Sequence, residues 1–99
     1  MKNIIISGRL VADPNVSQVG EKNTKVANFR IANNDGDKDN GEFYDVKAWE
    51  YLAEFSENYL KKGVKILIQG SFNNEGYQDK EGKNKTHFSI TAQKIEFLQ

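Results

Sequence analysis

The chain contains no cysteine, one proline, one histidine and no excess of charge of either sign. Without cysteine it can form neither a disulfide framework nor a thiolate metal site. Its 14 lysine and arginine residues equal its 14 aspartate and glutamate residues. A protein that binds nucleic acid mainly through phosphates usually carries excess positive charge. Any nucleic-acid ligand of this chain would therefore depend on base stacking more than is usual.

Long hydrophobic runs are also absent. The apolar run Ile4-Ile5-Ile6 near the start is too short for a signal peptide, and no stretch approaches the roughly 20 apolar residues of a membrane span. We therefore expect a soluble, cytoplasmic protein with no membrane partner. A length of 99 residues, 37% of them hydrophobic, predicts one domain over residues 1–99 with one modest core.

Residues suited to catalysis or metal binding do not form a usable pattern. His87 has no cysteine or second histidine with which to complete a metal site. Asp35, Asp37 and Asp39 surround Lys38, and no glutamate occupies the twelfth position of a calcium-binding loop. The sequence holds neither a Ser-His-Asp set nor a glycine-rich phosphate loop. We expect no metal, no cofactor and no enzymatic activity.

Residues 42–49 alternate with the two-residue period of a half-buried strand. One face of this strand carries Tyr44, Val46 and Ala48, and the other carries Phe43, Asp45, Lys47 and Trp49. Because water-facing positions are usually small or charged, two large aromatics beside a lysine are typical of a surface that stacks flat ligands such as nucleic-acid bases. Packing of both aromatics beneath loops or in a subunit interface is the alternative, and the strand alone favours neither.

Alternating hydrophobic patterns predict four further strands, at residues 3–11, 25–32, 64–72 and 88–97. In the last of these strands the apolar residues move from even-numbered to odd-numbered positions, which predicts a bulge near Gln93 and Lys94. The polar residues 73–85 predict a long hairpin arm that projects Tyr77.

A helix is predicted over residues 50–62. Leu52, Phe55, Tyr59 and Leu60 share one side at helical spacing. Acidic residues lie early and lysines late, which suits the helix dipole, and Gly63 is placed to cap the helix in a left-handed conformation.

Three strands, a helix and two strands predict an all-β protein with one helix. The order is that of the OB-fold, a five-stranded Greek-key barrel with a helix between strands 3 and 4. Other small barrels share this pattern. An OB-fold binds its ligand across its second and third strands, which places Phe43 and Trp49 on the binding face.

Several blocks of the sequence resemble bacterial single-stranded DNA-binding proteins. They are IIISGRLVADP at 4–14, VANFRIA at 26–32, AWEYLAE at 48–54, YLKKG at 59–63, IQGSF at 68–72 and YQDKEG at 77–82. These blocks occur in order, with compatible spacing, over nearly the whole chain. The resemblance implies an OB-fold homotetramer, with a dimer possible, that wraps single-stranded DNA during replication, recombination or repair.

The resemblance also implies particular DNA-binding residues. The stacking aromatics expected by position are Phe43, Trp49 and Tyr77, and the expected phosphate contacts are Lys62 and, on less specific grounds, Arg9 and Lys47. Two features depart from the family pattern. Asp37, or a neighbour in its acidic loop, stands where relatives can carry a further stacking aromatic, and residues 73–76 lack the arginines often found there.

The chain ends at Phe97-Leu98-Gln99, without the linker and acidic tip through which typical members recruit replication and repair enzymes. The resemblance therefore does not extend to that recruitment, and the sequence is either trimmed or that of a tailless variant, for example from a phage or mobile element. Ile5 and Val11 give the first strand a second apolar face, which fits subunit pairing.

Two other functions fit an OB-fold. A replication accessory module that mainly binds a protein partner would suit the neutral charge and the acidic loop. Oligosaccharide binding also uses aromatic platforms on this fold. The combination of Phe43, Lys47, Trp49 and Tyr77 favours single-stranded DNA over the protein partner, and the family blocks favour it over an oligosaccharide.

Overall fold

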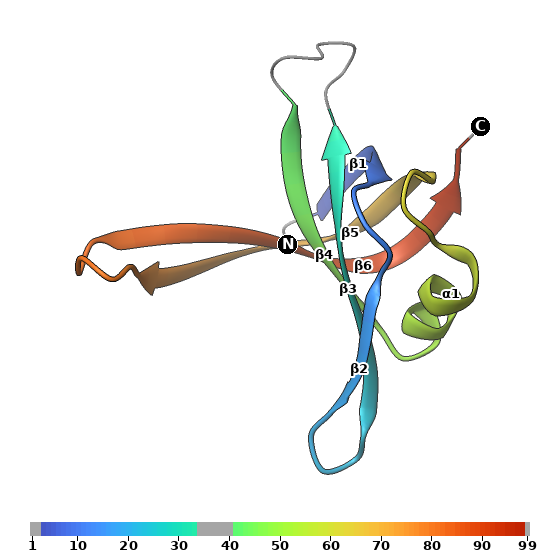
Figure 1. The fold of residues 1–99 in the computed structure, drawn as a ribbon, viewed down its shortest axis with the longest axis horizontal. Coiled ribbons are helices and arrows are strands. Elements are labelled where there is room, and N and C mark those ends of the chain that lie inside the picture. Colours follow the sequence, from blue (N-terminus) through green and yellow to red (C-terminus); the bar gives the residue numbers. More distant parts are fainter. Residues whose placement is uncertain (1–2, 34–40, 99) are drawn as a thin grey trace.

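The computed structural model describes residues 3–33 and 41–98, with the backbone alone at residues 74, 75, 77 and 85–88. Its elements in chain order are β1 (Asn3–Leu10), β2 (Asn15–Val19), β3 (Thr24–Asn33), β4 (Glu42–Trp49), α1 (Tyr51–Tyr59), β5 (Lys65–Gln78) and β6 (Asn84–Phe97) (Figure 1). No helix in these ranges is long and apolar enough to cross a bilayer.

Five of the strands close into a barrel. The sheet order is β1-β5-β6-β4-β3-β2, and β1 also pairs with β3. Arg9 lies opposite Ala32 and Leu10 opposite Ile31. These pairs join strands β1 and β3 and so close the sheet into a barrel. The β4–β6 pair is parallel, whereas the other pairs are antiparallel. Because α1 lies between β4 and β5, the third and fourth barrel strands, the predicted OB-fold is confirmed.

The barrel interior is filled by the inward face of each strand. The fully buried apolar side chains include Leu10, Ile31, Val46, Ile66, Ile68 and Ile90. These belong to one core cluster together with Ala27, Phe29 and Ala48, which lie on the buried faces of β3 and β4. Removal of this apolar surface from water is the main favourable contribution to folding, and it fixes which side of each strand faces outward.

Strand β2 was not predicted from the sequence. It forms a hairpin with β3, from the pair Asn15 and Asn28 to the pair Val19 and Thr24, and extends below the barrel in Figure 1. Within β2 only Val16 packs against the core, while the other residues are exposed. Such a strand has no alternating apolar pattern, so it gives no periodic signal in the sequence.

Helix α1 is shorter than predicted, because the chain leaves the helix at Leu60. That residue is extended, with φ −97° and ψ 136°, and turns its side chain, 2% exposed, into the core. Gly63 has a positive φ of 89°, as expected, but in the following turn and not at the helix end. Of the four residues expected to share one side of the helix, Tyr59 is 59% exposed, whereas the small residues Ala53 and Ser56 are buried.

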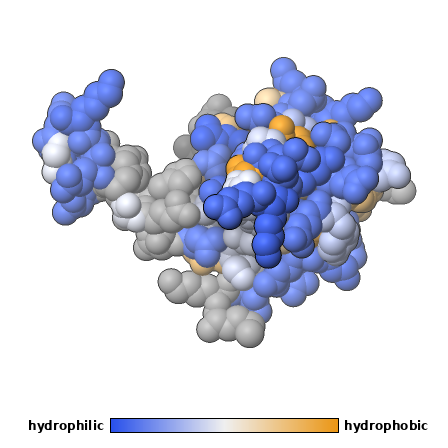
Figure 2. Space-filling model, turned by 90° about the horizontal axis from the view of Figure 1, so that it is seen from below, coloured by the Kyte–Doolittle hydropathy of each residue, from blue (hydrophilic) through white to orange (hydrophobic). Residues whose placement is uncertain are grey.

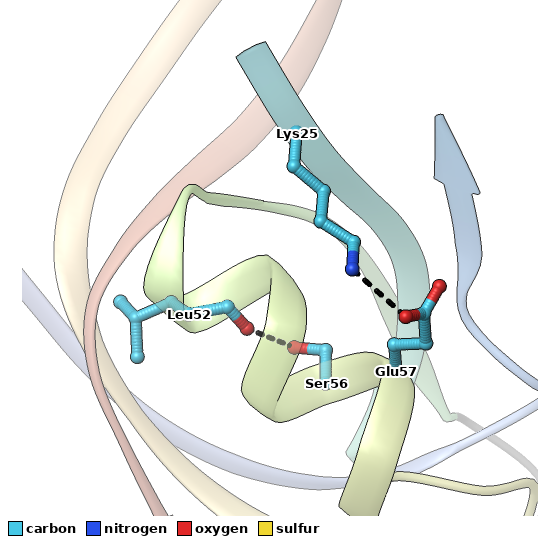
Figure 3. A network of polar contacts seen from close by, with 4 residues as sticks. All are labelled: Lys25, Leu52, Ser56 and Glu57. Atoms are coloured by element: carbon cyan, nitrogen blue, oxygen red, sulfur yellow. Dashed lines mark hydrogen bonds and ion pairs between the residues drawn. The ribbon is translucent and has the colours of Figure 1, made fainter. Parts of the chain in front are cut away.

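Figure 3 shows two polar contacts of α1, one to the barrel and one within the helix. Lys25 of β3 donates from its Nζ atom to Glu57 Oε1 at 2.8 Å, and this ion pair ties the helix to the barrel. The buried Ser56 hydroxyl donates to the Leu52 carbonyl one turn earlier, also at 2.8 Å. A hydroxyl that bonds back to its own helix can be buried without leaving an unsatisfied polar group. This is why the polar residue Ser56 can lie on the buried side of α1.

Beyond the barrel, β5 and β6 continue as the predicted arm, which projects to the left in Figure 1. Gln69 lies opposite Lys94 and Gly70 opposite Ala92, so Gln93 is the extra residue of a bulge, as predicted. The tip is a turn in which Asp79 Oδ1 accepts the backbone N–H groups of Glu81 and Lys83, each at 2.9 Å. The described side chains near the tip are hydrophilic and stand apart from the barrel in Figure 2.

Candidate nucleic-acid interface

The outer face of β4 carries the residues that the alternation predicts. Phe43 is 62% exposed and Trp49 is 37% exposed, and both lie on the side of the strand opposite the buried Val46 and Ala48. The two aromatics are six positions apart, which corresponds to about 20 Å along an extended strand. The face therefore offers two separate platforms for flat ligands, with Asp45 and Lys47 between them.

A groove of about 410 Å³ covers the stretch between these aromatics. We call it the β3–β4 groove. Its lining comes from the bend after β1 and from β3, β4 and β6, and consists of Val11, Ala12, Asp13, Asn28, Phe29, Arg30, Asp45, Val46, Lys47 and Ser89. Because the groove lies across the second and third barrel strands, it occupies the position at which OB-folds bind oligonucleotides or oligosaccharides.

An ion pair crosses the β3–β4 groove. Arg30 and Asp45 are register partners on β3 and β4, and Arg30 donates from Nε to Asp45 Oδ1 at 2.8 Å and from Nη2 to Oδ2 at 3.4 Å. The hydrogen bond to Asp45, supported by the charge of that carboxylate, raises the pKa of Arg30. The other charged lining residues are Asp13 and Lys47, so positive and negative side chains balance in the groove.

Arg9 and Lys62 lie near the end of the groove formed by the bend after β1. The backbone N–H of Lys62 donates to Asp13 Oδ1 at 2.8 Å, and Asp13 lines the groove. Arg9 donates from Nη1 to the carbonyl of Gly63, the next residue, at 3.1 Å. The turn after α1 thus brings together two cations that are far apart in the sequence.

Three of the predicted site residues, Phe43, Lys47 and Trp49, lie on one face of β4. Arg9 and Lys62 do not line the groove, but the backbone of Lys62 bonds to the lining residue Asp13, and Arg9 bonds to the neighbouring Gly63. Tyr77 lies on the arm, opposite Lys85, and its side chain is outside the described part of the chain. Its role as a stacking residue therefore stays a prediction.

Three groove residues were not assigned a role from the sequence, namely Asn28, Arg30 and Ser89. Asn28 and Arg30 lie on the exposed face of β3. Their positions opposite Lys47 and Asp45 depend on the register between β3 and β4, which the pattern of one strand does not reveal.

Other expectations fall outside the described residues. The acidic loop with Asp35, Asp37 and Asp39 lies in the undescribed segment 34–40, and only the backbone of His87 is described. Within the residues that the structure does describe, no group of three or more histidine or acidic side chains could hold a metal ion.

The barrel and the aromatic face define this chain as an OB-fold protein with a ligand groove across its second and third barrel strands. Comparison with known proteins identifies the particular group. The model of the single-strand binding protein family matches residues 1–98, so the chain belongs to that family.

Three bacterial relatives illustrate the similarity. Single-stranded DNA-binding protein 2 of Chlorobaculum tepidum is 30% identical over 105 residues, which cover 99% of this chain and 71% of the relative. Single-stranded DNA-binding protein 1 of Clostridium acetobutylicum is 27% identical over 104 residues, which cover all of this chain and 94% of the relative. The single-stranded DNA-binding protein of Clostridium tetani is 30% identical over 104 residues, which cover all of this chain and 71% of the relative.

Proposed function

We propose that this chain binds single-stranded DNA with little sequence preference and protects it during replication, recombination or repair. The observation that carries the proposal is the pair of exposed aromatics, Phe43 and Trp49, at either end of the β3–β4 groove in a member of the single-strand binding protein family. Similar proteins from several bacteria are named single-stranded DNA-binding proteins.

Stacking carries most of the proposed affinity. Each base laid on an aromatic ring contributes on the order of 1 to 3 kcal/mol, and any base can be accepted because every base has a flat face. Phe43 and Trp49 act in this way on β4, and Tyr77 supplies a third platform on the arm. This mechanism needs neither a cofactor nor a chemical step.

Phosphate contacts supply the rest of the affinity. Lys47 lies in the groove between the two aromatics, where it can meet the backbone of a strand whose bases are stacked on either side. Arg9 and Lys62 extend this row of cations past the bend after β1. The balanced charge of the groove lining supports a smaller electrostatic share than basic nucleic-acid binders have.

The proposed assembly is a homotetramer, with a dimer as the alternative, formed through β1. Ile5 is 65% exposed on that strand, and a large exposed aliphatic side chain on a strand suits burial against a second copy. Sedimentation of the wild type and of Ile5→Lys tests this point. A smaller species for the variant supports pairing through β1, whereas equal masses contradict it.

The first experiment uses Trp49, the only tryptophan of the chain. Its fluorescence is titrated with oligo-dT of about 20 nucleotides and with a duplex of matched length. Saturable quenching by the single strand alone is the expected result. A folded sample that shows no change at low salt contradicts DNA binding at this face.

A second candidate function is that of an accessory module whose main ligand is a protein. The neutral charge of the groove and of the whole chain favours it. In that case the aromatics would be covered by the partner, and neither the single strand nor the duplex would change the fluorescence of Trp49.

A further inference from the structure

The centre of the β3–β4 groove holds an arginine that is already occupied. The Arg30 guanidinium forms two hydrogen bonds with Asp45, at 2.8 and 3.4 Å, and the side chains of the pair are 54% and 31% exposed. Arginine presents a planar fork of donors that suits phosphate as well as carboxylate. In the free protein the carboxylate of Asp45 takes the place that a phosphate could take.

Asp45 also lies close to the other groove cation. Lys47 follows it on the same face of β4, two residues along the strand and therefore about 7 Å away. Because this separation is below the Debye length of about 8 Å at physiological salt, the negative charge of Asp45 acts on any phosphate that approaches either cation. One carboxylate thus weakens the attraction of both cations for DNA.

We propose that Asp45 is an affinity-limiting residue, which withholds Arg30 from the phosphates of single-stranded DNA. This inference rests on the proposed function and adds a residue that sets its strength. With Arg30 paired, Lys47 is the remaining cation of the groove lining, and Asp45 weakens its attraction for phosphate. The bound strand therefore depends more on the flanking aromatics and is released more easily when salt or a competing strand is present.

The test compares Asp45→Asn with the wild type by titration with oligo-dT of about 20 nucleotides over a series of salt concentrations. Asparagine keeps the size of the side chain and removes its charge. We expect binding about 3- to 10-fold tighter at low salt, and a slope of log affinity against log salt that is steeper by about 0.7, the value for one added contact to a single strand.

Glu57→Gln is the matched control. It removes one negative charge and breaks an exposed ion pair of the same length, Lys25–Glu57 at 2.8 Å, which lies between β3 and α1 and not in the groove. The salt slope of this variant should equal that of the wild type. An equal gain in Asp45→Asn and Glu57→Gln would overturn the inference, because the effect would then come from net charge.

The double variant Arg30→Gln/Asp45→Asn shows whether the gain acts through Arg30. Loss of the extra affinity and return of the wild-type slope support the inference, whereas a gain that persists without Arg30 overturns it. Thermal melting of each variant confirms folding, and Asp45→Ser replaces Asp45→Asn if the latter does not fold. Absence of DNA binding by the wild type is a failure of the proposed function, while wild-type binding with an unchanged slope in Asp45→Asn is a failure of this inference alone.

Discussion

Trp49 lies directly opposite Val26 across the antiparallel β3–β4 pair. Val26 is on the outer face of the barrel and is outside the core cluster, yet only 4% of it is exposed. Opposite side chains in such a pair have Cβ atoms about 4.5 to 5.5 Å apart, so the indole is close enough to cover the valine. The packed and the ligand-binding interpretations of Trp49 are therefore compatible, since the residue lies beside the buried Val26 while 37% of it stays exposed.

Replacement of the two aromatics should have different effects. Phe43→Ala removes a side chain that is 62% exposed opposite the small Ala32, so it should weaken DNA binding about 5- to 150-fold and leave stability nearly unchanged. Trp49→Ala should weaken binding by a similar factor and also lower the free energy of unfolding by about 1 to 2 kcal/mol, because Val26 becomes exposed. Anisotropy with labelled oligo-dT and urea denaturation measure the two quantities. Equal stability losses in both variants would contradict this distinction.

The salt dependence of binding should be shallow and should depend on Lys47. Contacts from Arg9, Lys47 and Lys62 predict a slope of about −2, at roughly 0.7 for each phosphate. Lys47→Gln should bring the slope closer to zero by about 0.7. Lys94→Gln is the control, because Lys94 pairs with Glu96 at 3.1 Å on β6 and does not line the groove. If both substitutions change the slope equally, Lys47 has no special contact with DNA.

The parts of the site that could be predicted from the sequence are those set within one strand. A period of two places Phe43, Lys47 and Trp49 on one face whatever the neighbouring strands are, and the inward face of β4 confirms that alternation. The pairing of Arg30 with Asp45 depends on the register of two strands, which comes from packing of the whole core. The charge balance of the groove could therefore not be predicted.

In the fold, too, features set by local sequence could be predicted and features set by packing between distant segments could not. The bulge at Gln93 was predicted from the switch of apolar residues from even-numbered to odd-numbered positions, which is visible within one strand. The end of α1 is not local, because Leu60 must leave the helix to enter the core and the next turn must bond to β1, where the Gly63 N–H donates to the Leu10 carbonyl at 2.8 Å. A prediction from helical spacing alone, over residues 50–62, is therefore longer than the observed helix Tyr51–Tyr59.

The Lys25–Glu57 ion pair should stabilise the fold only slightly, and only below strongly alkaline pH. The hydrogen bond to Glu57 raises the pKa of Lys25 above its ordinary value of 10.5. A raised pKa in the folded state gives a contribution that is complete below 10.5 and is lost as the pH rises through the folded value. Melting temperatures of the wild type and Lys25→Met should differ slightly at pH 8, and the difference should shrink as the pH rises above 10.5. A difference that does not shrink would indicate that the lysine stem, not its charge, matters.

Gly70 should tolerate no side chain, because β6 passes directly over it at the bulge. A Cβ atom at this position would overlap the Thr91 carbonyl oxygen and lie 3.1 Å from Ala92 Cα, both of them backbone atoms. Gly70→Ala should therefore lower the free energy of unfolding by about 1 to 3 kcal/mol. This corresponds to a melting temperature lower by roughly 4 to 8 °C for each kcal/mol.

Gly76→Ala is the matched control for that substitution. Gly76 lies on the arm, and a Cβ atom there would meet nothing within 4 Å. Its change in stability should stay within about 0.5 kcal/mol, the usual range for exposed positions. Thermal melts at one protein concentration compare the two variants, since any assembly of copies makes the midpoint depend on concentration. Equal melting temperatures for Gly70→Ala and the wild type would mean that the bulge can move away from β5, and that close approach of the backbones does not require glycine at residue 70.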